Sequence, residues 1–242
     1  MIGGLAVFVF TSSGWPVVQE TFFNVDVFKA DFPDILKAFW LDIKMFVVIE
    51  VAVLIFGLIV ALARTNRTPA LFPFRILSAV FCDFFRGVPV ILLIYIFGFG
   101  IPALDLGPSL DPVLLGGFAL FLAYSAYVAE VYRAGIASVH ASQMDAGLAM
   151  GLTRIQAMRY VILPQAIRRV RPPLLNDFIS LQKDVALVSV LGITEAFRLA
   201  QISSQSSFNY TPLIAVSVLY LLVTVPLSRF LDNRMAAGEI RS

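Results

Sequence analysis

Charged residues, cysteine and histidine are all scarce in this sequence of 242 residues. Asp, Glu, Lys and Arg make up 14% of it, whereas a soluble domain carries about 25% charged residues. The single cysteine, Cys82, excludes a disulfide within the chain. The single histidine, His140, excludes a multi-histidine metal site and leaves one candidate for any Ser-His-Asp or Cys-His catalytic arrangement. None of the four lysines lies in a phosphate-binding G-x-x-x-x-G-K-S/T loop, so the chain does not bind ATP by that route.

Apolar residues, in contrast, make up 59% of the chain, and its mean hydropathy is +0.87. Such a chain could build a core in water, but it could not cover its own surface with polar groups. The solvent that it suits is therefore lipid. Its net charge of +2 is too small to indicate a nucleic acid or another charged macromolecule as a partner.

Five apolar segments are each near the roughly 20 residues that a helix needs to cross a bilayer. They run over about Ile43–Ala63, Ile76–Ile101, Val113–Val131, Leu174–Ile193 and Leu213–Phe230. We therefore expect an all-α membrane protein with five core transmembrane helices. The fourth segment is the most polar of the five.

The apolar stretch Ile2–Val18 is weakened by Gly, Ser and Pro, and it lacks the basic start of a signal peptide. Two alternatives stay open for it, a short sixth span or a helix that lies at the membrane surface. We expect residues 1–35 to form an extracytoplasmic or membrane-associated extension. Residues 36–242 then form the transmembrane domain, with a long cytoplasmic loop at about residues 133–173.

Lys and Arg gather in the loop after the first span, in the loop between the third and fourth spans, and at the C-terminus. The positive-inside rule places these three segments in the cytoplasm and the segment before the first span outside. The residues that carry this orientation are Arg64, Arg67, Arg75, Arg133, Arg154, Arg159, Arg168, Arg169, Arg171, Arg229, Arg234 and Arg241.

The long loop contains local signals for two helices separated by a turn. Ser142 and Asp145 have the spacing of a helix N-cap box. Gly151 stands where a helix ends in the left-handed conformation. Thr153 and Gln156 form a second N-cap box.

Three prolines are expected to shape the rest of the loop. Pro164 should interrupt the second helix, and Pro172 with Pro173 should close the loop before the fourth span.

The first loop helix has a surface to which a partner protein could bind. Ala146, Ala149 and Met150 share one face at helical spacing, and small residues at 146, 147 and 151 allow a close approach. The alternative is an ordinary helical hairpin that packs on its own membrane domain. A DNA-binding helix-turn-helix also fits the turn locally, but membrane spans on both sides argue against it.

Charges within spans cost free energy, so each is a candidate for function. Glu50 could line a solute path and meet a cationic group, or it could pair with an arginine of a neighbouring helix or face a wet crevice. Asp83 and Arg86 could pair with each other. Gly87 and Pro89 should break the second span. The break could expose backbone groups that line a path, or it could be a plain kink.

Six other residues have narrower interpretations. Lys183 and Asp184 are adjacent, so they point in different directions, and either could face the path or a second subunit. Glu130 and Arg133 should form an i, i+3 pair that anchors the loop. We expect His140 to face solvent and Cys82 to be a small apolar filler.

The order of several motifs resembles the permease subunits of ABC importers for polar amino acids, of the histidine/glutamine/arginine type. The similar segments are residues 85–89 (FRGVP), 123–136 (AYSAYVAEVYRAGI), 145–152 (DAGLAMGL), 161–166 (VILPQA), 172–176 (PPLLN) and 183–187 (KDVAL). The resemblance covers about Asp42–Asp232. It departs from the family pattern at Asp145, where the family has Glu, at Gly147, where it has Ala, and at Val185-Ala186, where it has Thr-Ser.

This resemblance implies a type I importer fold and a set of partners. Two permease subunits, identical or sister chains, would pair around a central path, each docked on one of two ATPase subunits. These would bind ATP and Mg²⁺, and this chain would bind no cofactor itself. An extracytoplasmic binding protein would deliver the amino acid to this multi-pass protein of the bacterial inner membrane.

The resemblance also assigns residues to two sites. The coupling residues are Ser142, Asp145, Ala146, Gly147, Ala149, Met150, Gly151 and Leu152. The candidate residues of the solute path are Glu50, Arg86, Gly87, Pro89, Tyr124, Lys183 and Asp184. Two alternatives stay open: the same machinery for another small amine-bearing solute, and a secondary transporter or membrane scaffold that works without ATP.

Overall fold

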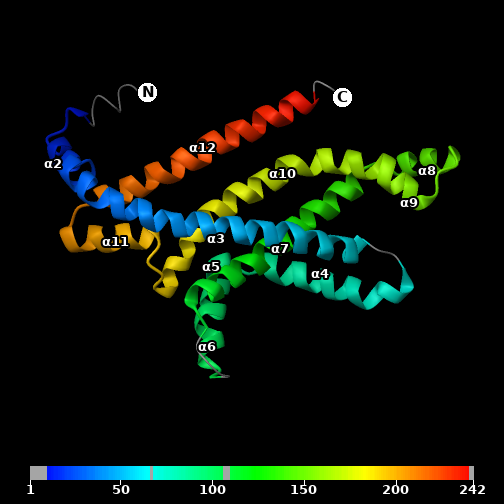
Figure 1. Cartoon of the computed structure of the whole chain (residues 1–242), viewed down its shortest axis with the longest axis horizontal. Coiled ribbons are helices and arrows are strands. Elements are labelled where there is room, and N and C mark those ends of the chain that lie inside the picture. Colours follow the sequence, from blue (N-terminus) through cyan, green and yellow to red (C-terminus); the bar gives the residue numbers. More distant parts are fainter. Residues whose placement is uncertain (1–9, 66–67, 106–109, 240–242) are drawn as a thin grey trace.

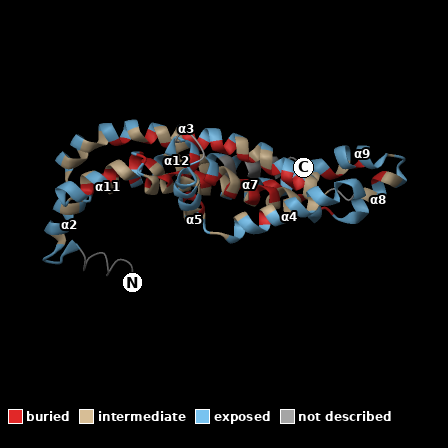
Figure 2. Cartoon of the chain, turned by 90° about the horizontal axis from the view of Figure 1, so that it is seen from below, coloured by how far each residue is buried: buried red, intermediate tan, exposed pale blue. Residues whose placement is uncertain are grey.

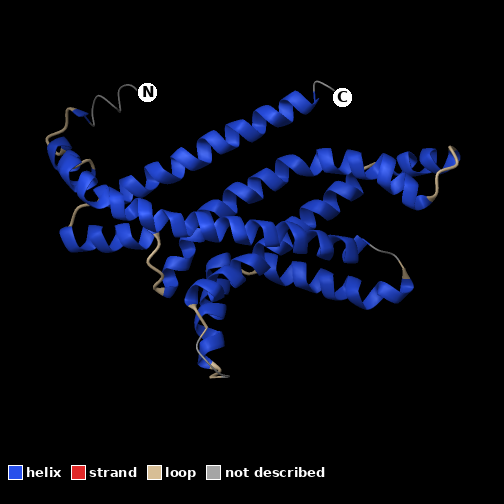
Figure 3. Cartoon of the chain, in the orientation of Figure 1, coloured by secondary structure: helices blue, strands red, loops and turns tan. Residues whose placement is uncertain are grey.

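The computed structural model describes residues 10–65, 68–105 and 110–239, and all secondary structure within them is helical (Figures 1 and 3). In chain order the elements are α2 (Trp15–Phe22), α3 (Val25–Thr65), η1 (Pro69–Leu71), α4 (Phe72–Gly87), α5 (Val90–Tyr95), η2 (Ile96–Gly100), α6 (Ile101–Ala103), α7 (Pro112–Ser138), α8 (Ala141–Ala149), α9 (Arg154–Ala157), η3 (Met158–Ile162), α10 (Leu163–Asp184), η4 (Val185–Leu191), α11 (Ala196–Ser207) and α12 (Thr211–Glu239). The predicted all-α fold is confirmed.

Helix α3 is longer than the first predicted span. Its 41 residues extend over about 60 Å at 1.5 Å per residue, which exceeds the thickness of a bilayer with its headgroups. The predicted span Ile43–Ala63 forms its second half. The first half was not expected to be helical, and it passes residue 35 without a break. The domain boundary placed there therefore stays a prediction.

The segment before α3 is only partly described. Residues 2–9 of the stretch Ile2–Val18 lie outside the described residues, and Trp15–Val18 belong to α2. The choice between a short span and a surface helix therefore stays open. Arg67 and Arg241, which were used for the orientation, also lie outside the described residues.

The second predicted span is broken at the expected place. Val88 and Pro89 are extended, because proline restricts the residue before it and lacks the N–H that a continuing helix needs. The helical segments on the two sides, Pro69–Gly87 and Val90–Ala103, meet at 103°. This bend is much larger than a simple proline kink, and it directs α5 and α6 away from α4 (Figure 1).

Helix α7, the third predicted span, lies at the centre of the bundle. It begins after Asp111, whose side chain accepts a hydrogen bond from the backbone N–H of Val113 at 2.8 Å. Figure 2 shows that the buried residues concentrate where α7 packs against its neighbours. On α3, Gly57 lets the two helices come close, since a Cβ there would lie 2.9 Å from Val128 Cγ1.

The prolines of the long loop do not act as predicted. One helical segment runs from Arg154 to Leu191, so Pro164 does not interrupt it and Pro172 and Pro173 do not precede the fourth span. Wide turns of η3 lie directly before Pro164, which sits in the first turn of α10, where a missing N–H costs little. Pro172 and Pro173 are exposed, so the carbonyls that they leave unpaired can meet water.

The fourth predicted span therefore begins earlier than expected, and it changes direction near its end. After α10 the chain tightens into η4, turns at Gly192 with φ +81°, and bends by 55° into α11. Glu195 caps α11, because its carboxylate accepts hydrogen bonds from the N–H groups of Phe197 and Arg198 at 2.6 and 2.7 Å.

Helix α12 contains the fifth predicted span and returns toward the end of the molecule where α8 lies (Figure 1). Thr224 of α12 donates a hydrogen bond of 2.6 Å to Gln182 of α10. Among the described residues, three helices are long and apolar enough to cross a membrane, or up to five if each bent pair is one span. The predicted count of five coincides with the upper number and stays a prediction.

A cluster of charges joins α3, α4 and α7. Glu130 of α7 accepts hydrogen bonds from Arg64 of α3 at 2.6 Å and from Arg133 at 3.0 and 2.5 Å. The predicted pair Glu130–Arg133 is thus confirmed, but it also holds α3. The Arg86 guanidinium of α4 lies 3.8 Å from the same carboxylate. Cys82 is fully buried nearby among apolar neighbours, as predicted.

Gly57→Ala is expected to lower the midpoint of thermal unfolding, because the new methyl group would press on Val128 and on the backbone nitrogen of Ala129, 3.3 Å away. Overpacking of this kind costs about 1–3 kcal/mol. Gly117→Ala is the matched control in the same pair of helices, since its nearest atom is 3.6 Å away. Thermal unfolding of the two variants in one detergent checks this, and equal midpoints would contradict it.

Glu130→Gln should destabilise the bundle by about 1.5–3 kcal/mol, the usual contribution of hydrogen bonds to charged groups, because Arg64 and Arg133 lose their shared carboxylate. Asp34→Asn removes the exposed pair with Lys37 and should cost less than about 1 kcal/mol. The same unfolding assay compares them. A Glu130→Gln variant as stable as Asp34→Asn would show that the cluster does not hold α3 to α7.

Candidate solute cleft and coupling helix

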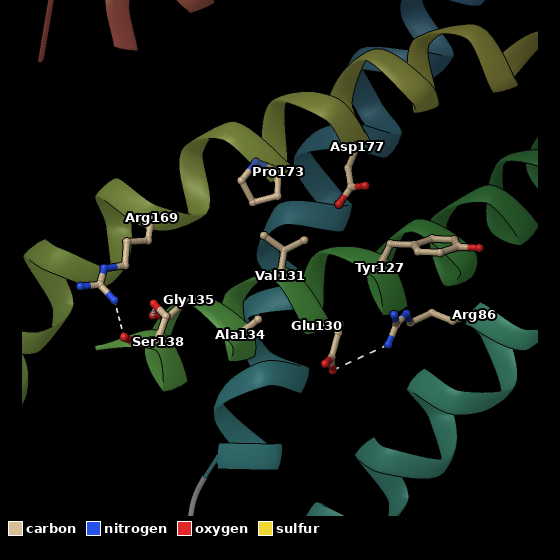
Figure 4. A pocket seen from close by; sticks show the side chains of 10 residues that line it. All are labelled: Arg86, Tyr127, Glu130, Val131, Ala134, Gly135, Ser138, Arg169, Pro173 and Asp177. Carbon is tan, nitrogen blue, oxygen red and sulfur yellow. Dashed lines mark hydrogen bonds and ion pairs between the residues drawn. The ribbon is translucent and has the colours of Figure 1, made fainter. Parts of the chain in front are cut away.

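A cleft of about 400 Å³ opens between α4, α7 and α10. Figure 4 shows its polar walls: Arg86 comes from α4, Tyr127 and Glu130 from α7, and Asp177 from α10. Val131, Ala134, Gly135 and Pro173 form its apolar floor, with Ser138 and Arg169 at one end. The break at Gly87–Pro89 places Arg86 at the end of α4, where the side chain can reach into the cleft.

Two carboxylates at or beside this cleft form no hydrogen bond or ion pair with the described residues. The Oδ2 atom of Asp177 is buried and accepts no hydrogen bond. Glu50 of α3 is 8% exposed, and within the described part of the chain it forms no hydrogen bond or ion pair. Its charge is expected to interact with that of Asp177, which in turn is expected to interact with the Arg86 guanidinium. The predicted alternative, in which Glu50 pairs with an arginine of a neighbouring helix, is wrong, because the arginines of α3 and α7 gather on Glu130.

A second polar contact joins α7 and α10 deeper in the bundle. The Tyr124 hydroxyl donates a hydrogen bond of 2.8 Å to Asp184. Two predicted path residues therefore meet, and neither lines the cleft. Lys183, adjacent to Asp184, is exposed on another face of the helix, as expected for neighbouring helical residues.

The predicted pair of Asp83 with Arg86 does not form. Asp83 instead lies 3.9 Å from Arg64, and Arg86 turns toward Glu130 (Figure 4). The two side chains share a helix face, but each of them has an oppositely charged residue nearby on another helix. The consequence is that Arg86 faces the cleft.

Helix α8 begins differently from the prediction. Its N-cap is His140, whose Nδ1 accepts a hydrogen bond from the backbone N–H of Ser142 at 3.2 Å. Ser142 therefore lies inside the first turn, and the predicted cap box of Ser142 with Asp145 is wrong. His140 is exposed, as predicted, but it also starts the helix. An imidazole nitrogen of the N-cap residue can accept the backbone N–H of the second helical residue, as a serine oxygen does.

The end of α8 and the start of α9 confirm the local signals. Gly151 adopts φ +83°. The N–H of Leu152 donates to the carbonyl of Gly147 at 3.1 Å, and the N–H of Gly151 donates to Leu148 at 3.0 Å. These two bonds form a Schellman motif. The second predicted N-cap box is complete in both directions between Thr153 and Gln156.

The exposed face of α8, made by Ser142, Asp145, Ala146, Ala149 and Met150, points away from the rest of the chain. Figure 2 shows α8 and α9 as a largely exposed tip at one end of the molecule. Met150 is 83% exposed. Gly147 is not on this face but is buried against α9, where a Cβ would lie 3.0 Å from that of Ala157. The small size of Gly147 allows α8 to pack closely against α9. It does not contribute to the surface that a partner could approach.

Three acidic residues were missed in the sequence: Asp42 and Glu195, which are buried, and Asp177, which is partly buried. Asp177 lies inside the fourth predicted span, and the counting of charges within spans that drew attention to Lys183 could have found it. Asp42 and Glu195 lie one and two residues outside predicted spans, so they were counted as loop residues. In the structure Asp42 is buried and accepts a hydrogen bond from Tyr220 at 3.2 Å.

Known proteins resemble this chain over most of its length. The probable glutamine ABC transporter permease protein GlnM of Bacillus subtilis is 33% identical over 216 residues, which cover 88% of this chain and 98% of that protein. The glutamine transport system permease protein GlnP of Escherichia coli is 35% identical over 197 residues, 79% of this chain and 90% of that protein.

A solved structure shows the same architecture. The crystal structure of an amino acid ABC transporter with histidines contains a chain that is 30% identical, with a TM-score of 0.77. The match covers 85% of this chain and 94% of that one. The family described as binding-protein-dependent transport system inner membrane component matches residues 53–234, a range that includes the cleft and α8. The chain therefore belongs to the family of inner membrane components of binding-protein-dependent transport systems.

Proposed function

We propose that this chain is the permease subunit of an ABC importer that moves polar amino acids into the cytoplasm by alternating access. Family membership supports the transport class. The relatives support the solute class, because their names include glutamine and arginine permeases. The cleft between α4, α7 and α10 supports a solute path, since charged side chains of both signs line it within a membrane bundle.

The proposed complex contains two permease subunits, two ATPase subunits and an extracytoplasmic binding protein. The ATPase subunits bind ATP and Mg²⁺, because this chain has no phosphate-binding loop. Its C-terminus and α8 lie on the cytoplasmic side, in agreement with the arginines of the α7–α10 connection. In Figure 1 α12 also runs back toward the end where α8 lies.

The observation that carries the proposal is the geometry of α8. It is a short, well-capped helix at the tip of the molecule, with small residues and one long apolar side chain on its free face. A helix that exposes Ala146, Ala149 and Met150 can lie in a groove of another protein, and its small side chains let the two backbones come close. An ATPase subunit is the partner that the family implies for this surface.

Force applied to α8 would reach the cleft through direct contacts. Gln143 of α8 accepts a hydrogen bond of 3.1 Å from Gln165 of α10. Arg169 of α10 donates to the carbonyl of Ser138 at the end of α7. At Gly135 the same two helices pack closely, so α8 is linked to α10 and α10 to α7. Because α7 and α10 form two walls of the cleft, a displaced α8 changes its shape.

Ala149→Arg is expected to release the ATPase subunit, because a long charged side chain would occupy the centre of the docking face while the internal contacts of α8 stay intact. Asp145→Arg should act in the same direction. Gly151→Trp is a poorer test, since φ +83° would strain the end of α8 itself. Co-purification of the ATPase with tagged permease, and uptake by reconstituted vesicles, measure the effect. A loss of at least tenfold is expected in both.

Ala30→Arg is the matched control. Ala30 is also an exposed helical alanine, but it lies in the first part of α3, at the opposite end of the molecule. This variant should keep the ATPase. If Ala149→Arg retained the ATPase and full uptake, α8 would not be the coupling helix.

A further inference from the structure

A groove of about 400 Å³ lies between α3 and α7, and none of its lining residues belongs to the cleft described above. It opens at the surface of the bundle, because Val48 of α3 and Leu114 of α7, which line it, are 70% and 65% exposed. Apart from Lys44, all of its lining residues are apolar. On a bundle of membrane helices, an open apolar groove of this kind is expected to hold hydrocarbon.

The groove begins near the membrane surface and extends through about one leaflet. On α3 it reaches from Leu41 to Ala52, about 16 Å at 1.5 Å per residue. One leaflet of hydrocarbon is about 15 Å thick, half of the bilayer core. Leu41 comes two residues before the apolar segment Ile43–Ala63, so this end of the groove lies at the level of the lipid headgroups. The groove therefore has the length and the depth of one acyl chain.

Gly117 of α7 keeps the middle of the groove open. A Cβ at this position would have Ile49 Cδ1 at 3.6 Å and Met45 Cε at 3.9 Å as its nearest atoms, and both are side-chain ends on α3. The space beside the glycine is thus bordered by apolar groups of the opposite helix. A large side chain at position 117 would occupy this space without changing the charge of the groove.

Lys44 lies at the headgroup end of the groove and has no acidic partner. Within the described residues, no carboxylate is within ion-pair distance of its Nζ. Asp42, two residues earlier, is buried and accepts a hydrogen bond from Tyr220. Lys44 Nζ instead lies 5.8 Å from the ring centre of Trp40, which is 59% exposed. Tryptophan is enriched at headgroup level, and a cation–π contact leaves the ammonium its donors for an anion.

We propose that this groove binds one anionic phospholipid, with an acyl chain between α3 and α7 and its phosphate on Lys44. The apolar lining fits the chain, and the unpaired ammonium fits the charge of the headgroup. A zwitterionic lipid brings a cation of its own, which would lie near Lys44 and weaken its binding. This site is independent of the transported solute and of the ATPase.

The competing occupant is a second copy of the permease. It would cover Lys44 with protein, and a lysine enclosed between apolar helices needs a counter-charge. A phospholipid brings that charge in its phosphate, at the depth where the lysine lies. The lipid is therefore the occupant that fits both the groove and its cation.

The fluorescence of Trp40 can report on this site, because the sequence contains two tryptophans and Trp15→Phe leaves Trp40 alone. The full-length chain with this change is reconstituted in phosphatidylcholine vesicles that contain a minor fraction of brominated phosphatidylglycerol or, in a parallel sample, of brominated phosphatidylcholine. Bromine quenches tryptophan on contact, so comparison of the two quenching curves gives the relative affinity of the lipids beside Trp40. We expect a preference for phosphatidylglycerol of about fivefold, the effect of one lysine at an anionic surface.

Lys44→Gln should abolish this preference. Gly117→Phe should abolish it as well, although Lys44 is kept, because the acyl chain loses its place. Ala52→Phe fills the groove from the side of α3 and should act in the same way. Lys29→Gln is the matched control, since Lys29 is also an exposed lysine of α3 but does not line the groove, and it should keep the preference.

Equal affinity for the two lipids in the chain with Lys44 intact would overturn the inference, and so would a preference that Lys44→Gln leaves unchanged. A preference that survives both Gly117→Phe and Ala52→Phe would overturn it too, since Lys44 would then attract headgroups without a site for the chain. If neither brominated lipid quenched Trp40, protein rather than lipid would cover the groove, and the second permease copy would be its occupant.

Discussion

The structure depends on how closely its helices can approach α7. In lipid there is little hydrophobic force to bring apolar helices together, so dispersion contacts, small residues and polar bonds hold them. Gly57 brings α3 against Val128, and Gly135 does the same for α10 at Val170. The Glu130 cluster then adds charged bonds between α3 and α7. A side chain one methyl group larger at Gly135 would press α7 and α10, two walls of the cleft, apart.

The same contacts connect the two candidate sites. The cleft lies between α4, α7 and α10. In the chain, α8 belongs to the connection between the end of α7 and the start of α10. Arg169 binds the carbonyl of Ser138 at the point where these two helices come together. A small rigid hairpin at the tip of the molecule can therefore act on the shape of the cleft. Gly147 contributes by letting α8 close tightly on α9.

Local signals allowed the helices and the turns to be predicted, whereas long-range partners could not be. The N-cap box at Thr153 and Gln156 depends on four consecutive residues, and so does the left-handed end at Gly151. The break at Gly87–Pro89 is equally local. The start of α8 was misplaced because Ser142 is a common cap residue and His140 is not. Pro172 and Pro173 were read as helix ends, although an exposed helix side tolerates them.

Ion pairs were the least predictable part of the candidate site. Asp83 and Arg86 have the spacing of a helical pair, but each pairs with a residue of another helix. Asp83 lies beside Arg64, and Arg86 lies beside Glu130. Glu130 and Arg133 do form their local pair, and the third member of that cluster, Arg64, is 66 residues away in sequence. Asp177 became informative only when the structure showed that it lines a cleft and that its Oδ2 atom is buried without a hydrogen-bond partner.

The central claim is that this chain works as one part of an ATP-driven complex. The most direct measurement is to isolate the unmodified chain from its own host in mild detergent and to identify the co-purifying subunits by mass. The account predicts an ATPase subunit together with a second permease subunit. Recovery of the chain alone, under conditions that keep other ABC complexes intact, would contradict it and would favour a transporter or scaffold that works without ATP.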